Sequence, residues 1–183
     1  MLKKIPYQTC LPILQRYEPG DEAKAHEQDT PQTLIDSLLE QQQYIELMTF
    51  LCHALPMRET LWLACQALKI RTKYWTDDEN LAIEDCLRWF KEPDEASRRL
   101  AEQHVQKLEL KCAPGWLAQA VFWNGSGSIA ALDQPQVLPP EFLYAKAAAG
   151  AINMAAALPE WDKADAYNGR VTELALKLAR GER

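Results

Sequence analysis

Apolar residues recur at helical spacing along most of the chain. The first clear stripe carries Leu34, Ile35 and Leu38, and similar stripes follow until about residue 180. Spacings of three and four residues place side chains on one face of an α-helix. No segment of four to eight residues shows the clean apolar–polar alternation of a half-buried strand. The pattern therefore predicts an all-α fold.

Helix-start signals divide this pattern into separate helices. Thr30 is placed to cap a helix that has Pro31 in its first turn, and Thr76–Glu79 has the sequence of a capping box. Pro56 and Pro114 each open a further apolar segment. In total the chain predicts about seven to eight helices, arranged as a bundle or a helical stack.

Several boundaries are less sharply defined by the pattern. The polar run Gln41–Gln43 leaves open whether residues 31–55 form one bent helix or two short helices. An alanine-rich helix is expected at about 141–157, and a last helix at about 170–180. Residues 1–29 contain three prolines and a polar run, and we expect an irregular N-terminal arm there. Residues 30–183 then form a single helical domain.

Composition excludes some function classes. The formal net charge is −6 and no run of basic residues occurs, so binding of nucleic acid through its phosphates is not expected. The densest basic pair, Arg98 and Arg99, is interpreted as a solvated helix face. No stretch of 18 apolar residues and no signal peptide is visible, which predicts a cytoplasmic protein without membrane insertion.

Cysteine and histidine usage predicts neither disulfides nor a metal. The five cysteines are widely spaced without a C-x-x-C pair, which is typical of reduced, mostly buried thiols. None of the three histidines is at ligand spacing from a cysteine. Adjacent Cys52 and His53 would point about 100° apart on a helix, so we interpret them as a core thiol beside a surface imidazole.

The sequence also offers no catalytic residue or cofactor site. The glycine-rich segment Asn124–Ser128 follows a predicted helix and precedes a proline-bearing loop, whereas a phosphate-binding loop lies between a strand and a helix. We interpret it as a helix stop. The acidic pairs are mostly at helix starts, where the helix dipole favours them. The chain is therefore predicted to be non-enzymatic and to need no cofactor.

Tryptophan is abundant, with six residues in the chain. Trp62, Trp89 and Trp116 fall on or near apolar stripes and are expected in the core. Trp75 and Trp123 lie in or beside connections, so each could either anchor a loop or contact a partner.

The connection from Trp123 to Pro140 is the longest one after the N-terminal arm. Its apolar residues must either fold back on the helices or remain available to a partner. The candidate partner-binding residues are Trp75, Trp123, Ile129, Leu132, Val137 and Leu138.

Two segments together carry a resemblance to a known family. Leu55–Cys65 has the form L-P-x-R-E-x-x-W-x-A-C, and Ala113–Ser128 contains P-G-W-x-A-x-A-x-F-W-x-G. This pairing resembles a family of uncharacterised bacterial helical proteins that is associated with type VI secretion gene clusters. The motif residues, for which we expect a structural role, are Pro56, Arg58, Glu59, Trp62, Cys65, Pro114, Gly115, Trp116, Phe122, Trp123 and Gly125.

The resemblance implies a function in protein–protein recognition. It predicts an adaptor or co-chaperone for an effector or spike-tip protein of type VI secretion, with a protein partner and no nucleic acid. The alternative is an immunity protein that neutralises a neighbouring toxin, because small acidic helical proteins suit basic nucleases. The resemblance supplies no catalytic residues.

Overall fold

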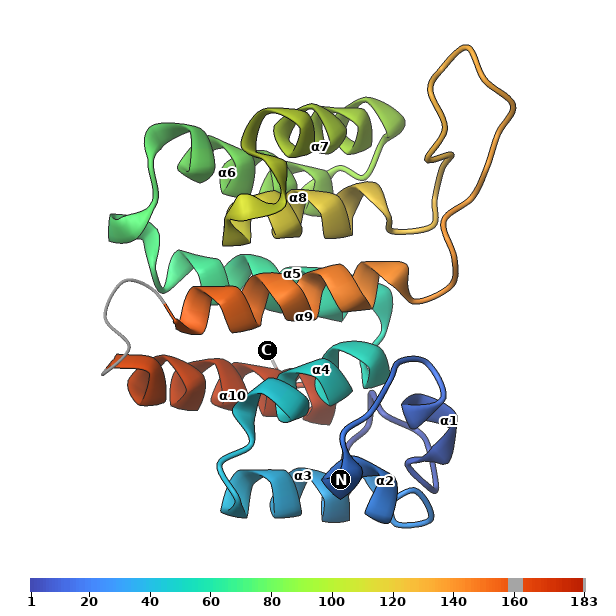
Figure 1. Ribbon diagram of the computed structural model, residues 1–183, viewed down its shortest axis with the longest axis vertical. Helices are drawn as coiled ribbons and strands as arrows, with labels where there is room; N and C mark the ends of the chain where they lie inside the picture. The colour runs from blue at the N-terminus through green and yellow to red at the C-terminus, as the bar shows by residue number, and fades with distance from the viewer. Residues whose placement is uncertain (158–162, 183) are drawn as a thin grey trace.

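Helices make up most of the described chain, which comprises residues 1–157 and 163–182 of a computed structural model (Figure 1). Within these ranges no strand occurs and the fold is all-α, as the periodicity predicts. The ten α-helices are α1 (Leu11–Leu14), α2 (Asp21–Ala25), α3 (Pro31–Glu40), α4 (Tyr44–Ala54), α5 (Met57–Lys69), α6 (Asp77–Lys91), α7 (Glu95–Leu108), α8 (Ala113–Phe122), α9 (Leu143–Ala156) and α10 (Ala164–Arg180). Short 3-10 turns, η1 (Thr72–Tyr74) and η2 (Glu109–Lys111), precede α6 and α8.

The predicted helix starts are confirmed where a capping signal marks them. The Thr30 hydroxyl accepts a hydrogen bond from the Thr33 amide at the start of α3. At α6, Thr76 and Glu79 form the reciprocal capping box. The chain between residues 31 and 55 forms two helices, because Gln42 takes a left-handed conformation with φ of 56° and ends the first one.

The last helix is longer than its apolar stripe predicts. α10 begins at Ala164, about two turns before the expected start near residue 170. In these first turns only Tyr167 is buried, so the segment has little hydrophobic periodicity to reveal it.

The N-terminal arm is less irregular than the sequence predicts. Residues 1–29 contain α1 and α2, and Ile5, Cys10 and Ile13 are buried in the common core. The Lys4 amide also donates to the Ala179 carbonyl at the end of α10, 2.9 Å away. The arm is therefore packed on the body, because a few apolar side chains at irregular spacing are buried there.

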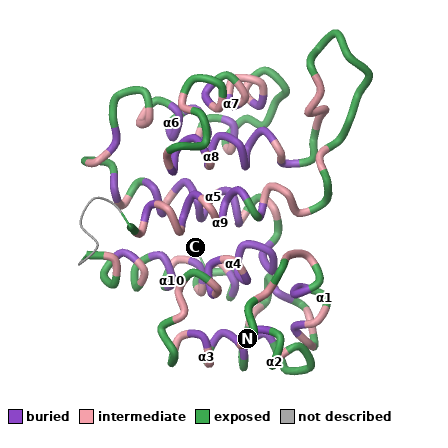
Figure 2. The backbone as a smooth tube through the Cα atoms, viewed as in Figure 1, coloured by how far each residue is buried: buried purple, intermediate pink, exposed green. Residues whose placement is uncertain are grey.

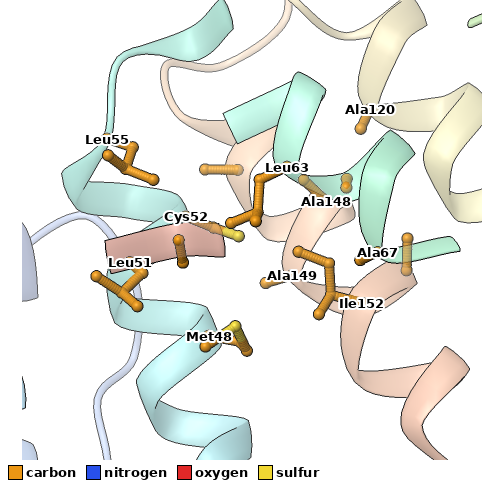
Figure 3. Packing of buried hydrophobic residues seen from close by; sticks show 14 of the residues in the cluster. Met48, Leu51, Cys52, Leu55, Leu63, Ala67, Ala120, Ala148, Ala149 and Ile152 are labelled. Atoms are coloured by element: carbon orange, nitrogen blue, oxygen red, sulfur yellow. The ribbon is translucent and has the colours of Figure 1, made fainter. Parts of the chain in front are cut away.

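α9 lies at the centre of the helix packing and contacts α4, α5, α8 and α10. Its buried residues are six alanines and Ile152, and methyl side chains let helix backbones approach closely. Figure 3 shows how α4, α5, α8 and α9 meet in this core. The residues labelled there are Met48, Leu51, Cys52, Leu55, Leu63, Ala67, Ala120, Ala148, Ala149 and Ile152.

α5 is the second central helix, and five neighbours contact it: α4, α6, α8, α9 and α10. Figure 1 shows it between α6 and α10. One stripe of α5 stays uncovered, in which Arg58 and Lys69 are exposed and Trp62 and Gln66 are half-buried. Figure 2 shows the contrast between the buried inner helix faces and the exposed connections. None of the described helices is both long and apolar enough to span a membrane.

Candidate partner-binding surfaces

The connection between α8 and α9 projects from the helical body (Figures 1 and 2). Leu132 is 85% exposed, Leu138 is 63% exposed and Val137 is 52% exposed. Ile129 differs from them, because it is half-buried and packs against the core. Of the four apolar loop residues predicted to bind a partner, three are therefore available at the surface and one holds the loop to the body.

Hydrogen bonds close the base of this loop. The Ile129 amide donates to the Val137 carbonyl at 2.8 Å. The Ser128 hydroxyl accepts from the Val137 amide at 2.9 Å and from the Ala130 amide at 3.1 Å. These bonds join residues on both sides of the exposed tip, so the tip is presented on a closed base.

Arg98 connects the loop to the body. Its guanidinium donates to the Phe122 carbonyl and to the Ser128 carbonyl, both at 2.8 Å, and forms two 2.7 Å bonds to Glu95. The side chain is 0% exposed, and its Cζ lies 4.8 Å from the centre of the Phe122 ring. Arg99 donates to the Ala130 carbonyl at 3.0 Å. The interpretation of this pair as a solvated helix face is therefore wrong, because the loop covers it.

Gly127 is required by the same arrangement. A Cβ atom at this position would lie 2.7 Å from the Glu95 carboxylate and 2.8 Å from two nitrogens of Arg98. Gly125 has a different role, since its φ of 90° is in the left-handed region that favours glycine. Gly125 and Gly127 thus let the chain turn and pass close to the Arg98–Glu95 pair.

Trp75 and Trp123, for which the sequence allows either a loop anchor or a partner contact, take different positions. Trp75 is only 8% exposed, and its indole N–H donates to the Leu68 carbonyl at 2.8 Å. It anchors the connection between α5 and α6, so it is not available as a partner contact. Trp123 is half-buried and packs against the core at the beginning of the loop.

The other residues of the second motif have local structural roles. A Cβ atom on Gly115 would lie 2.1 Å from the Glu109 carbonyl oxygen, so only glycine fits there. Trp116 is half-buried, and its indole N–H donates to the Leu110 carbonyl at 3.1 Å. Pro114 is buried in the first turn of α8. These contacts hold the start of α8 against η2.

Three residues of the first motif lie at the surface rather than in the core. Arg58, Glu59 and Trp62 line a groove of about 700 Å³ on the uncovered stripe of α5. The expectation that Trp62 is a core residue is therefore wrong, whereas Leu55, Ala64 and Cys65 of the same motif are buried. The physical reason is that Trp62 falls at the edge of the buried face of α5, where no neighbouring helix covers it.

Other elements complete the groove, which we call the Trp62 groove. α10 forms one side, with the apolar pair Leu174 and Leu178, and Phe90 at the end of α6 forms the other side. The remaining lining residues are Lys4, Lys177, Gly181 and Glu182.

The charged residues of the Trp62 groove differ in their partners. Lys4 and Glu59 form an ion pair of 2.9 Å, and Lys177 pairs with Glu173 at 2.7 Å. Arg58 instead donates to the Phe90 carbonyl at 2.8 Å and lies over the Phe90 ring. Among the described residues no carboxylate pairs with Arg58.

The buried thiols and titratable side chains of the core are protonated or hydrogen-bonded within the chain. Burial raises the pKa of the Cys52 and Cys65 thiols to about 12, so both are protonated at neutral pH. His104 and Asp85 are buried and hydrogen-bonded at 2.7 Å, which joins α7 to α6. In residues 1–157 and 163–182, no three His, Cys, Asp or Glu side chains come together as a metal site would require.

The prediction that His53 lies at the surface is wrong. It is buried and stacks on Tyr17 with ring centroids 4.7 Å apart, and its carbonyl accepts a hydrogen bond from Arg16. Burial also lowers the pKa of this imidazole. The sequence placed it at the surface because α4 alone would expose it, whereas the packed N-terminal arm covers it.

The loop and most of the Trp62 groove lie within a segment that is shared with other proteins. Residues 34–179 match a family of unknown function, DUF6931, and this is most of the chain. The chain belongs to DUF6931. The family match includes both motif segments, the loop and most of the Trp62 groove, but it leaves out the N-terminal arm and Glu182. No curated protein and no solved structure matches this DUF6931 protein.

Proposed function

We propose that this DUF6931 protein is a non-enzymatic adaptor that binds a protein partner through the α8–α9 loop. The observation that carries the proposal is the group of three exposed apolar side chains, Leu132, Val137 and Leu138, on a loop with a closed base. Loops on a rigid scaffold are common binding elements. Because the base is already ordered, a partner would need to order less of the loop on binding.

Other features agree with a binding function. The most nucleophilic side chains of the described core are buried thiols whose raised pKa keeps them protonated. The loop tip contains one formal charge, Asp133, so its apolar side chains can be buried without desolvating many charged groups. We propose as the partner an effector or spike-tip protein of bacterial type VI secretion, on the basis of the resemblance of the two motif segments.

Replacement of residues 129–138 by a Gly/Ser linker of equal length would confound binding with loss of the Ile129 contact. A sharper variant is Leu132→Asp combined with Leu138→Asp, which changes two exposed side chains and leaves the base intact. The matched control is Ile45→Asp combined with Leu81→Asp, at exposed positions on α4 and α6.

The experiment co-purifies each form with the effector and spike-tip proteins encoded in the same gene cluster. We expect wild type and control to retain a partner, and the loop variant to lose it by at least tenfold in affinity with an unchanged melting temperature. Equal retention by the loop variant would contradict the loop as the site. If co-expression with a neighbouring toxin instead restores growth, the protein is an immunity protein and the adaptor proposal fails.

A further inference from the structure

The Trp62 groove continues along the seam between α5 and α10. A second hollow is lined by Gln66 and Lys69 of α5, by Ile70 directly after it, and by Arg170, Glu173, Leu174 and Lys177 of α10. Leu174 and Lys177 line both hollows. The uncovered stripe of α5 and the facing residues of α10 therefore form one elongated surface, which we call the α5–α10 seam.

The α5–α10 seam is basic although the protein is acidic. The two hollows contain five cationic side chains, Lys4, Arg58, Lys69, Arg170 and Lys177, and three carboxylates, Glu59, Glu173 and Glu182. The difference is two positive charges, on a chain whose formal net charge is −6. Arg58, Lys69 and Arg170 form no ion pair with any described residue, whereas Lys4 and Lys177 are paired. The seam therefore has three cations available to carboxylates of a partner.

The seam also has an apolar centre and the shape of a helix-binding site. Trp62 lies between Phe90 on one side and Leu174 and Leu178 on the other. From residue 170 to 178, α10 rises about 12 Å, which corresponds to about two turns of a helix placed alongside it. α6 and α10 both pack on α5, so the uncovered stripe runs between two helices, as the groove of a helix-binding site does.

We propose that the α5–α10 seam binds an acidic amphipathic helix of a protein partner. Leucine-like side chains of that helix pack on Trp62, Leu174 and Leu178, and its flanking carboxylates pair with Arg58, Lys69 and Arg170. The aromatic and aliphatic centre of the seam favours such a helix, whose leucine-like side chains it can bury, over a nucleic acid, whose affinity comes mainly from phosphate contacts. This site is separate from the α8–α9 loop, so the two would let an adaptor hold two partners.

The probe is a stapled helical peptide of about 15 residues with Leu at positions i, i+3, i+4 and i+7 and Glu on the flanks. One control peptide carries Lys in place of every Glu, and another has the Leu/Glu residues scrambled. Binding to the full-length protein is measured by fluorescence anisotropy of the labelled peptide. We expect a dissociation constant below about 100 μM for the Leu/Glu helix, weakening as salt is added, and at least tenfold weaker binding of both controls.

Protein variants locate the bound peptide. Arg58→Glu and Trp62→Ala should each weaken binding at least tenfold, whereas Lys111→Glu, which changes the net charge as Arg58→Glu does but lies at η2, should change it less than twofold. If Trp62→Ala does not fold, Arg170→Glu at an exposed position of α10 takes its place. The loop variant Leu132→Asp/Leu138→Asp should bind the peptide normally, so failure of the loop proposal and failure of this one are distinguishable.

Three results would overturn the proposal. Equal binding of the Lys or scrambled peptide would show that neither charge nor amphipathicity matters. Unchanged affinity in the seam variants would place the peptide elsewhere. Tighter binding of a single-stranded oligonucleotide, lost in Arg58→Glu, would assign the seam to nucleic acid.

Discussion

Arg98 and Arg58 make the same local contact in two different regions of the molecule. Each guanidinium lies over a phenylalanine ring at the end of a helix, 4.8 Å from Phe122 and 4.7 Å from Phe90, and donates to the carbonyl of that phenylalanine at 2.8 Å. Cations near the end of a helix are favoured by its exposed carbonyl groups. The contact alone therefore does not separate a structural arginine from one that is available to a ligand.

The difference lies in what else each arginine contacts. Arg98 is fully buried and also binds the Ser128 carbonyl and Glu95, so its donors are used within the chain. Arg58 is exposed and has no carboxylate partner among the described residues. Arg98 therefore belongs to the fold and Arg58 to a surface.

The largest expected effect is that of Arg98→Ala. It leaves a buried and a half-buried carbonyl group without their donor and removes one of the two arginine partners of Glu95, which should lower the free energy of unfolding by about 3 kcal/mol. Urea unfolding monitored by circular dichroism measures it. Arg98→Lys keeps the charge but not the planar fork, so it should fall between wild type and Arg98→Ala. A loss below about 1 kcal/mol for Arg98→Ala would mean that the arginine is not structural.

Gly127→Ala should have the next largest effect. The added methyl group would be closer than 3 Å to both Glu95 and Arg98, so one of them must move. Overpacking of this kind lowers stability by about 1–3 kcal/mol. The matched control is Gly169→Ala in α10, where nothing lies within 4 Å of the new Cβ and a helix gains from alanine. In thermal unfolding we expect Gly127→Ala to lower the melting temperature and Gly169→Ala to raise it. A change of the same sign in both variants would contradict the close approach at Gly127.

The ion pair beside Gly127 should make stability depend on acid pH. Hydrogen bonds from Arg98, and then from Arg99, hold the pKa of Glu95 below its ordinary value of 4.5. The pair therefore stabilises the fold fully above that value, and its contribution is lost as the pH falls through the lowered pKa. The free energy of unfolding of Glu95→Gln should be lower than that of wild type at pH 7, and this difference should disappear in acid. A difference that is independent of pH would show that the charge of Glu95 is not the cause.

Arg58→Ala should have the smallest effect on the fold. An exposed cation–π contact is worth about 0.5–1 kcal/mol, so the free energy of unfolding should fall by no more than this. The same urea titration measures it beside Arg98→Ala. A loss as large as that of Arg98→Ala would erase the distinction between the two arginines and make Arg58 part of the fold.

The sequence predicts those features of the fold that depend on local contacts. Thr30 and the capping box at Thr76 and Glu79 act within one helical turn, so helix starts can be predicted from neighbouring residues alone. The all-α class follows from periodicity in the same way. The start of α10 is not predictable by this signal, because Tyr167 is the sole buried residue in its first turns.

The candidate surfaces depend on contacts between distant segments, which periodicity does not report. Arg98 is buried because Ser128, 30 residues later in the chain, lies against it. Trp62 has the spacing of a core residue, but whether a neighbouring helix covers it is decided by the packing of α6 and α10 around α5. Leu132 and Leu138 were predictable as loop residues, but their exposure follows from the bonds that Ser128 makes at the loop base.

The alanine-lined face of α9 has a consequence for how the interior responds to mutation. Its buried side chains, apart from Ile152, are single methyl groups, so substitution by glycine removes little volume. Enlargement is different, because close packing of α8 and α9 leaves no room for extra methylene groups. The buried alanine positions of α9 should therefore tolerate loss of volume better than gain of volume, in contrast to the buried leucines of α4 and α5, where truncation is the more damaging change.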